Sequence, residues 1–203
     1  MTRFEQEKWQ ARYAGLPSGR LPPKPPARWL RRWSRVVPRG RVVDLGAGLG
    51  GNALYLAARG TSVLGIDISE RAVRALRQTA LNRGLGLELI VADLDVFPLP
   101  VNRFDGVLCF FYLNRPLFPQ IRNSLKPGGV FLMEAFVTDP QRPDKDQPRY
   151  RLAEGELLRA FGDWEVLDYD EGIHPQSPHS QAATARICAR KPKPALRPMP
   201  SGY

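Results

Sequence analysis

A glycine-rich stretch and three aspartates are the residues of this sequence whose types and spacing could do chemistry. Gly46, Gly48 and Gly51 satisfy the pattern G-x-G-x-x-G at the start of an expected helix. Glycines in such a turn let a ligand touch the backbone, and the N-terminus of the following helix favours a negative group. The match alone is weak, because a glycine-rich turn can also serve only to reverse the chain.

The three aspartates, each at the end of an apolar run, narrow the choice of ligand. Asp44 stands two residues before Gly46, where a carboxylate would repel a pyrophosphate but would suit an ammonium group. Asp67, 21 residues after Gly46, can accept hydrogen bonds from both hydroxyls of a ribose. Asp93 can accept from an exocyclic amine of a purine. Each aspartate could instead cap the helix that follows it. Three aspartates at the ends of three successive apolar segments, however, favour one shared site.

The ligand predicted by these residues has an adenine, a ribose and an amino acid head, and no pyrophosphate. Ile68 and Leu94 stand next to two of the aspartates and offer apolar faces to the ring. S-adenosylmethionine fits this description. No metal is expected, because Cys109 and Cys188 are the two cysteines of the chain and cannot form a zinc cluster or a disulfide framework. This cysteine content favours a reducing, cytoplasmic setting.

Strands and helices are expected to alternate at intervals of 20–25 residues. The early strands are apolar on both faces, which is typical of the parallel sheet of a doubly wound α/β fold. Ligands bind such a sheet at the carboxyl ends of its strands, where the glycines and the three acids lie. Strands are expected over 41–45, 62–66, 87–91, 104–113, 130–136, 164–169 and 183–189, and helices over 2–15, 27–36, 52–59, 70–82, 115–125 and 155–161.

Residues 41–136 resemble the core of the class I S-adenosylmethionine-dependent methyltransferases. The segments that carry the resemblance are VVDLGAGLGGNALYLAARG, VLGIDIS, VADLDVFPLPVNRFDGVL and SLKPGGVFLMEAF. A front signature over 9–13 and the closing ARKP are similar to the small single-domain tellurite-resistance methyltransferases. The resemblance implies a Rossmann-like sheet of seven strands, mostly parallel with the last strand antiparallel, and methyl transfer to a small-molecule acceptor.

The resemblance also implies which residues form the site. Phe110 faces the methyl donor and the acceptor, with core packing as the alternative role. Trp9 and Tyr13 belong to a lid over the cofactor, with a merely stabilising helix as the alternative. His174 is the candidate catalytic residue, although Pro175 follows it in place of the Arg of those relatives, which puts a tellurite-type substrate in doubt. The expected cofactor-binding residues are Asp44, Gly46, Ala47, Gly48, Asn52, Asp67, Ile68, Ala92, Asp93, Leu94, Phe110, Trp9 and Tyr13.

The net charge of +10 is concentrated at the two ends of the chain. Residues 1–40 contain ten Lys or Arg against two Glu, and residues 186–203 contain five basic residues and no acid. We expect a lid with a proline-rich linker over 1–38, a methyltransferase domain over 39–191 and a basic, proline-rich and disordered tail over 192–203. The arginines of the lid favour an anionic small-molecule acceptor. No apolar run is long enough to span a membrane.

Three other functions compete with this interpretation. An RNA methyltransferase is favoured by the basic ends, but a nucleic-acid binder more often carries its basic patch on the folded body, and there is no Asn-Pro-Pro-Tyr-like motif after the fourth strand. The glycine pattern is also found in nicotinamide-dependent oxidoreductases, but Asp44 would repel the pyrophosphate of their cofactor. A cofactor-binding module without activity is the third. The sequence leaves the acceptor atom and the oligomeric state open.

Overall fold

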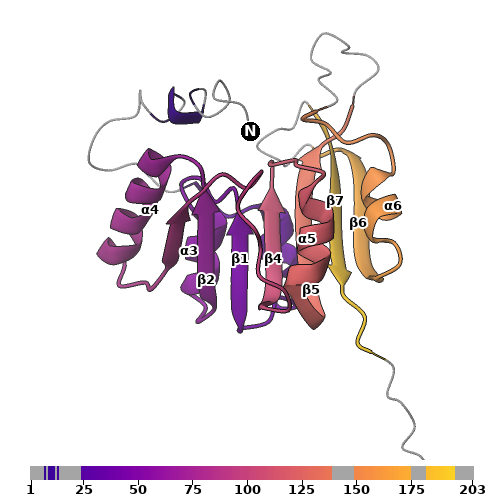
Figure 1. Cartoon of the computed structure of the whole chain (residues 1–203), viewed down its shortest axis with the longest axis horizontal. Helices are drawn as coiled ribbons and strands as arrows, with labels where there is room; N and C mark the ends of the chain where they lie inside the picture. The colour runs from indigo at the N-terminus through magenta and orange to yellow at the C-terminus, as the bar shows by residue number, and fades with distance from the viewer. Residues whose placement is uncertain are drawn as a thin grey trace, which may run out of the picture.

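A seven-stranded mixed sheet forms the centre of the computed structural model, which describes residues 7, 9–11, 13, 24–138, 149–174 and 182–194 (Figure 1). Its strand order is β3-β2-β1-β4-β5-β7-β6. β7 runs antiparallel to both of its neighbours, and the other pairs are parallel. The predicted Rossmann-like sheet with its last strand antiparallel is therefore confirmed. The strands are β1 (Arg41–Leu45), β2 (Ser62–Asp67), β3 (Glu88–Val91), β4 (Phe104–Phe110), β5 (Leu125–Phe136), β6 (Glu165–Ile173) and β7 (Ala183–Arg190).

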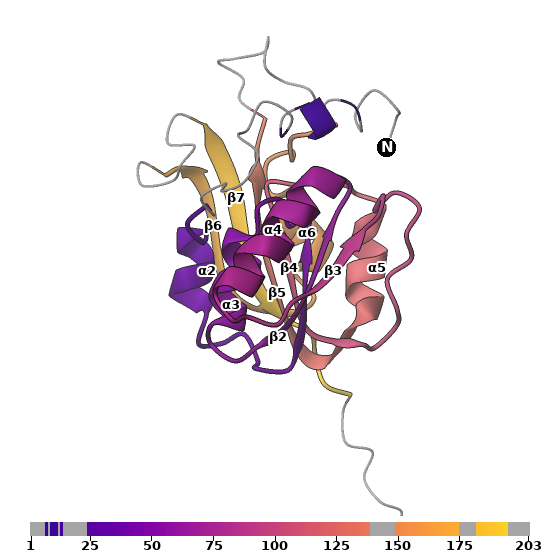
Figure 2. The same ribbon diagram turned by 90° about the vertical axis from the view of Figure 1, so that its left-hand side faces the viewer.

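Helices cover both faces of the sheet because successive side chains of its central strands point into two separate cores. Val43 and Leu45 of β1 belong to the core that the sheet forms with α5 and α6, whereas Val42 belongs to the core with α2 and α3. Figure 2 shows α3 and α5 on opposite sides of the sheet. Within the described residues, no helix is both long and apolar enough to cross a bilayer. The helices are α2 (Arg28–Trp33), α3 (Gly51–Ala57), α4 (Glu70–Asn82), α5 (Leu117–Ser124) and α6 (Glu156–Phe161).

Two strands differ in length from the sequence-based expectation. β4 ends at Phe110 rather than at residue 113, because Phe111 turns the chain with a φ of 56°. β5 begins at Leu125, ahead of the expected turn at 126–129. Gly128 N donates to Lys191 O and Lys191 N donates to Gly129 O, each at 2.9 Å, so Lys191, the residue after β7, pairs with the first part of β5.

Candidate active site

The loop that joins β1 to α3 depends on glycines with left-handed backbone angles. The φ angles of Gly46, Gly48 and Gly50 are 71°, 54° and 73°, a region that side chains disfavour. A Cβ on Gly46 would also lie 3.1 Å from Tyr112 Cβ. Gly46 N and Ala47 N donate to Ile66 O at 2.9 and 3.0 Å, which ties the loop to the end of β2. The loop therefore has a fixed shape that exposes its backbone.

Asp67, the last residue of β2, holds this loop against the start of α4. Its Oδ2 accepts from Gly48 N at 2.7 Å and its Oδ1 accepts from Ser69 N at 2.8 Å. Burial raises the pKa of this carboxyl group, and the backbone donors oppose the shift. Each oxygen of an ionised carboxylate can accept further hydrogen bonds, so Asp67 can still bind hydroxyl groups.

Asp44 lies on β1, before the loop begins. It is 2% exposed, and its Oδ2 has no hydrogen-bond partner among the described residues. Burial, followed by the charge of Asp67, raises the pKa of Asp44 to about 7. Asp44 is not among the residues that line the cavity described next, so it would act on a ligand through its charge rather than by direct contact.

One cavity of about 490 Å³ runs along the carboxyl ends of the strands. This volume is within the usual range for sites that bind small molecules. The cavity brings together eleven of the thirteen residues expected to bind the cofactor: Trp9, Tyr13, Gly46, Ala47, Gly48, Asn52, Asp67, Ile68, Ala92, Leu94 and Phe110.

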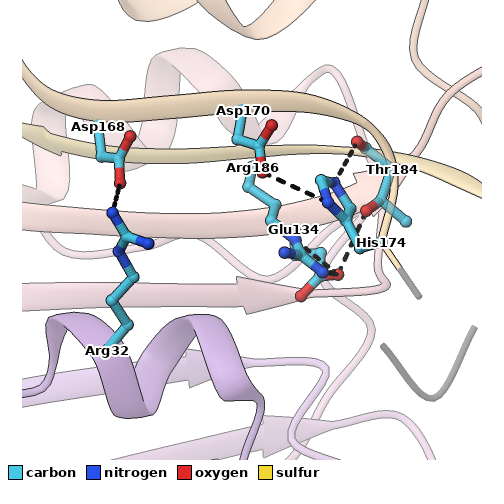
Figure 3. A network of polar contacts seen from close by, with 7 residues as sticks. All are labelled: Arg32, Glu134, Asp168, Asp170, His174, Thr184 and Arg186. Atoms are coloured by element: carbon cyan, nitrogen blue, oxygen red, sulfur yellow. Dashed lines mark hydrogen bonds and ion pairs between the residues drawn. The ribbon is translucent and has the colours of Figure 1, made fainter. Parts of the chain in front are cut away.

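Asp93 and His174 do not line this cavity. Asp93 Oδ1 accepts from Asp95 N at 2.9 Å, within its own turn. His174 Nε2 donates to Thr184 O at 3.2 Å, and its Nδ1 lies 3.3 Å from Asp170 Oδ2 (Figure 3). His174 thus lies in a network between β6 and β7, and its position does not favour the catalytic role expected from the sequence.

Residues before β1 form one wall of the cavity. Ala27 N donates to Asn52 Oδ1 at 2.8 Å, and a Cβ on Gly51 would lie only 2.4 Å from Lys24 O. Tyr13 is buried, and its Oη lies 3.0 Å from the place that a Cβ on Gly48 would take. The chain around residues 24–27 therefore packs directly on the glycine loop. The rest of the expected lid (1–6, 8, 12 and 14–23) lies outside the described residues, as do residues 195–203 of the expected tail.

The far end of the cavity contains two charged residues that were not predicted from the sequence. Glu134 of β5 and Arg186 of β7 line the cavity next to Phe110, Phe111 and Phe136. The signal that could have revealed them is a charged residue inside each apolar run, VFLMEAF and TARICAR. Their proximity, however, depends on strand pairing that neither run shows by itself.

Comparisons with known proteins agree with this geometry. A family profile described as "Methyltransferase domain" matches residues 42–129. The chain is 29% identical over 147 residues to the probable S-adenosyl-L-methionine-dependent methyltransferase TehB of Haemophilus influenzae, covering 69% of this chain and 51% of TehB. It is 30% identical over 151 residues to phosphoethanolamine N-methyltransferase 3 of Arabidopsis thaliana, covering 66% of this chain and 31% of that protein. The chain thus spans about half of TehB.

Solved structures share the fold. The crystal structure of TehB from Haemophilus influenzae superposes with a TM-score of 0.67 and 23% identity, over 81% of this chain and 61% of that one. The protein of the structure "Conversion of a Disulfide Bond into a Thioacetal Group during Echinomycin Biosynthesis" gives a TM-score of 0.69 and 22% identity, over 95% of this chain and 94% of that one. The shared fold, the match to the methyltransferase-domain profile and the match to TehB make the chain similar to the class I S-adenosylmethionine-dependent methyltransferases.

Proposed function

We propose that the protein transfers a methyl group from S-adenosylmethionine to a small-molecule acceptor. The observation that carries this proposal is that one cavity joins the glycine loop and Asp67 to a second, aromatic end. A cofactor and an acceptor can therefore lie side by side in it. The relatives support a small acceptor, since one of them is named for methylating phosphoethanolamine.

The cofactor half of the cavity is assigned to the residues around the glycine loop. Asp67 accepts the ribose hydroxyls while its present donors hold the loop, and Ile68, Ala92 and Leu94 pack on the adenine. The charge of Asp44 favours the amino group of the methionine portion. A buried carboxylate oxygen without a partner fits a cationic group nearby, because such an oxygen is costly unless something compensates it.

The chemistry needs little from the protein beyond placement. S-adenosylmethionine supplies an activated methyl group on a sulfonium when bound. The walls of the cavity orient the acceptor for an in-line displacement, which can contribute several kcal/mol, about 7–11 in the best intramolecular cases. Trp9 and Tyr13 shield the reacting groups from water, and Lys24 and Arg28 at the cavity wall favour an acceptor that carries an anionic group away from its reacting atom. Both cysteines are free and buried, which agrees with action in a reducing compartment such as the cytoplasm.

Calorimetry with S-adenosylmethionine, S-adenosylhomocysteine and NAD tests the binding step. We expect both adenosyl ligands to bind and NAD not to bind. Tight binding of NAD without a response to S-adenosylmethionine would overturn the proposal. Incubation with methyl-labelled S-adenosylmethionine and a metabolite extract, followed by mass spectrometry, should then show label in a small product rather than in RNA.

A further inference from the structure

Three side chains from three neighbouring strands form a row at the aromatic end of the cavity. Phe110 of β4 is the register partner of Glu134 of β5, and Glu134 is the register partner of Arg186 of β7. Paired residues on neighbouring strands project to the same face of a sheet. All three side chains line the cavity. A carboxylate and a guanidinium therefore stand beside the position expected for the methyl group.

Glu134 is held through one of its two oxygens. Its Oε1 accepts from Arg186 Nε at 3.1 Å, from Arg186 Nη2 at 3.0 Å and from Thr184 Oγ1 at 3.3 Å (Figure 3). His174 Nε2 donates in turn to Thr184 O. Glu134 is 2% exposed, so this network fixes the carboxylate inside the protein.

The other atoms of the pair remain available to a ligand. Glu134 Oε2 and Arg186 Nη1 make no hydrogen bond with the described residues, and neither is among the buried unpartnered atoms. The pair thus offers one acceptor and one donor at the cavity wall. A hydroxyl group is the complement of this pattern, since it both donates and accepts. A carboxylate lacks the donor and an ammonium group lacks the acceptor.

The wall around this pair is aromatic and partly strained. The rings of Phe111 and Phe136 lie 5.4 Å apart at 45°, and both residues line the cavity. Phe111 has a φ of 56°, which is unusual for an aromatic residue. Its N donates to Glu134 O at 2.7 Å, which helps to hold it there. Strained backbone that the surroundings enforce is concentrated at functional sites.

We propose that Glu134 and Arg186 bind the acceptor, and that this acceptor is an aromatic alcohol whose hydroxyl donates to Glu134 Oε2 and accepts from Arg186 Nη1. This rests on the proposed methyltransferase function. The hydroxyl oxygen forms the new bond to the methyl carbon, the carbon–sulfur bond breaks with its electron pair on sulfur, and the hydroxyl proton passes to Glu134 Oε2. Arg186 balances the carboxylate charge before the transfer, and the aromatic wall packs on the ring.

The test uses 4-nitrophenol, whose neutral and ionised forms have different absorption spectra, with S-adenosylhomocysteine present so that no turnover occurs. A hydroxyl that donates to a carboxylate stays protonated, so the apparent pKa of bound 4-nitrophenol should rise by about one unit or more. A lowered value, as expected if Arg186 alone binds the oxygen, would overturn the proposal. This measurement needs only the unmodified protein.

Two variants test whether Glu134 causes the rise in the apparent pKa of bound 4-nitrophenol. In Glu134→Gln the apparent pKa of bound 4-nitrophenol should no longer be raised. This variant should bind neutral 4-nitrophenol about tenfold more weakly, while S-adenosylhomocysteine still binds. Glu165→Gln is the matched control, because Glu165 also pairs with an arginine on the neighbouring strand, Arg190, but does not line the cavity. Equal spectra for wild type and Glu134→Gln would overturn the assignment.

Competition separates this inference from the proposed function. Phenol should displace 4-nitrophenol about tenfold better than benzoate, which has no donor for Glu134. Equal displacement would overturn the assignment of an alcohol while leaving the methyltransferase intact. Failure to bind S-adenosylhomocysteine would instead overturn the proposed function itself.

Discussion

The ionised form of the buried Asp44 carboxyl group lowers the stability of the fold. Its pKa of about 7 lies above the ordinary value of 3.8, because burial and the nearby charge of Asp67 disfavour the ionised form. Cys109, whose thiol pKa is itself raised by burial and by Asp44, is the other titratable group beside it. Between pH 4 and 7 the folded state therefore holds a proton that the unfolded state has lost. The contribution of protonated Asp44 to stability is present at low pH and is lost as the pH rises through 7.

Asp44→Asn should remove this pH dependence. We expect the thermal midpoint of the wild type to fall relative to that of the variant between pH 5 and pH 8. A ligand that carries an ammonium group favours ionised Asp44, so wild-type affinity for S-adenosylhomocysteine should rise from pH 6 to pH 8, while that of the variant stays low and flat. Scanning and titration calorimetry measure both, with Asp95→Asn as an exposed control. Parallel pH profiles for wild type and Asp44→Asn would contradict this role.

Asp67 combines a structural role with the proposed ribose contact. Asp67→Ala should weaken S-adenosylhomocysteine binding by about 1.5–3 kcal/mol, because it removes charge-assisted hydrogen bonds. The domain should still fold, at lower stability, since Gly48 N and Ser69 N lose their acceptor. Titration calorimetry on folded variant protein measures the loss.

Ser69→Ala is the control for the structural part of that effect. It removes the N-cap of α4, worth about 1 kcal/mol, and leaves the carboxylate of Asp67 in place. Its melting temperature should fall, and its affinity for S-adenosylhomocysteine should fall less than that of Asp67→Ala, because Ser69→Ala removes only the contact of Ser69 Oγ with Gln10 Oε1 on that side of the site. If Asp67→Ala has the same profile as Ser69→Ala, then Asp67 only holds the loop and does not bind the cofactor.

At the scale of elements, the glycine loop positions the wall formed by residues 24–27. Gly51 is the contact point, since a Cβ there would lie 2.4 Å from Lys24 O and 2.8 Å from Pro25 O, both backbone atoms. Backbone cannot swing aside as a flexible side chain can. The approach of two segments, rather than a left-handed angle, is therefore the reason for a glycine at this position.

Gly51→Ala should displace this wall. Overpacking costs about 1–3 kcal/mol unless the neighbour moves, so we expect lower stability, weaker binding of S-adenosylhomocysteine and faster exchange of the amides of Ala27 and Arg28. Gly86→Ala is the matched control, because a Cβ on Gly86 meets nothing within 4 Å. Exchange and thermal melting of the two variants provide the comparison. Identical results for both would mean that the wall does not depend on Gly51.

The elements also show which parts of the site the sequence could predict. The glycine loop, Asp67 and Ile68 belong to short local motifs at the ends of strands, so the order of residues is enough to predict their neighbourhood. Glu134 and Arg186 are 52 residues apart and meet only through the pairing of β5 with β7. The register of these two strands depends on long-range packing. The short apolar segments around Glu134 and Arg186 predict only that each is a buried strand. The early end of β4 escaped prediction for the same reason, since the hydrogen bond from Phe111 N to Glu134 O helps to hold its turn.

Across the whole molecule, the ends of the strands and the described residues near the N-terminus line one cavity. Trp9 and Tyr13 line the cavity, and Ser69 Oγ donates to Gln10 Oε1 at 3.3 Å. These contacts join the first residues of the chain to the ends of β1 and β2. The N-terminal segment has too few apolar residues for a core of its own, so we propose that contacts with the sheet and with a bound cofactor hold it in place.

Deletion of residues 1–15 should therefore leave the domain folded but raise the dissociation constant for S-adenosylmethionine and remove most turnover. Closure of such a segment excludes water from the sulfonium and completes the pocket for the acceptor. Amide exchange should show peptides over residues 4–14 protected by S-adenosylhomocysteine, and deletion of residues 195–203 is the control at the other basic end. Unchanged kinetics after the N-terminal deletion, or exchange that does not respond to the ligand, would mean that the segment only stabilises the domain. A change in binding with an unchanged melting temperature would instead establish it as a lid.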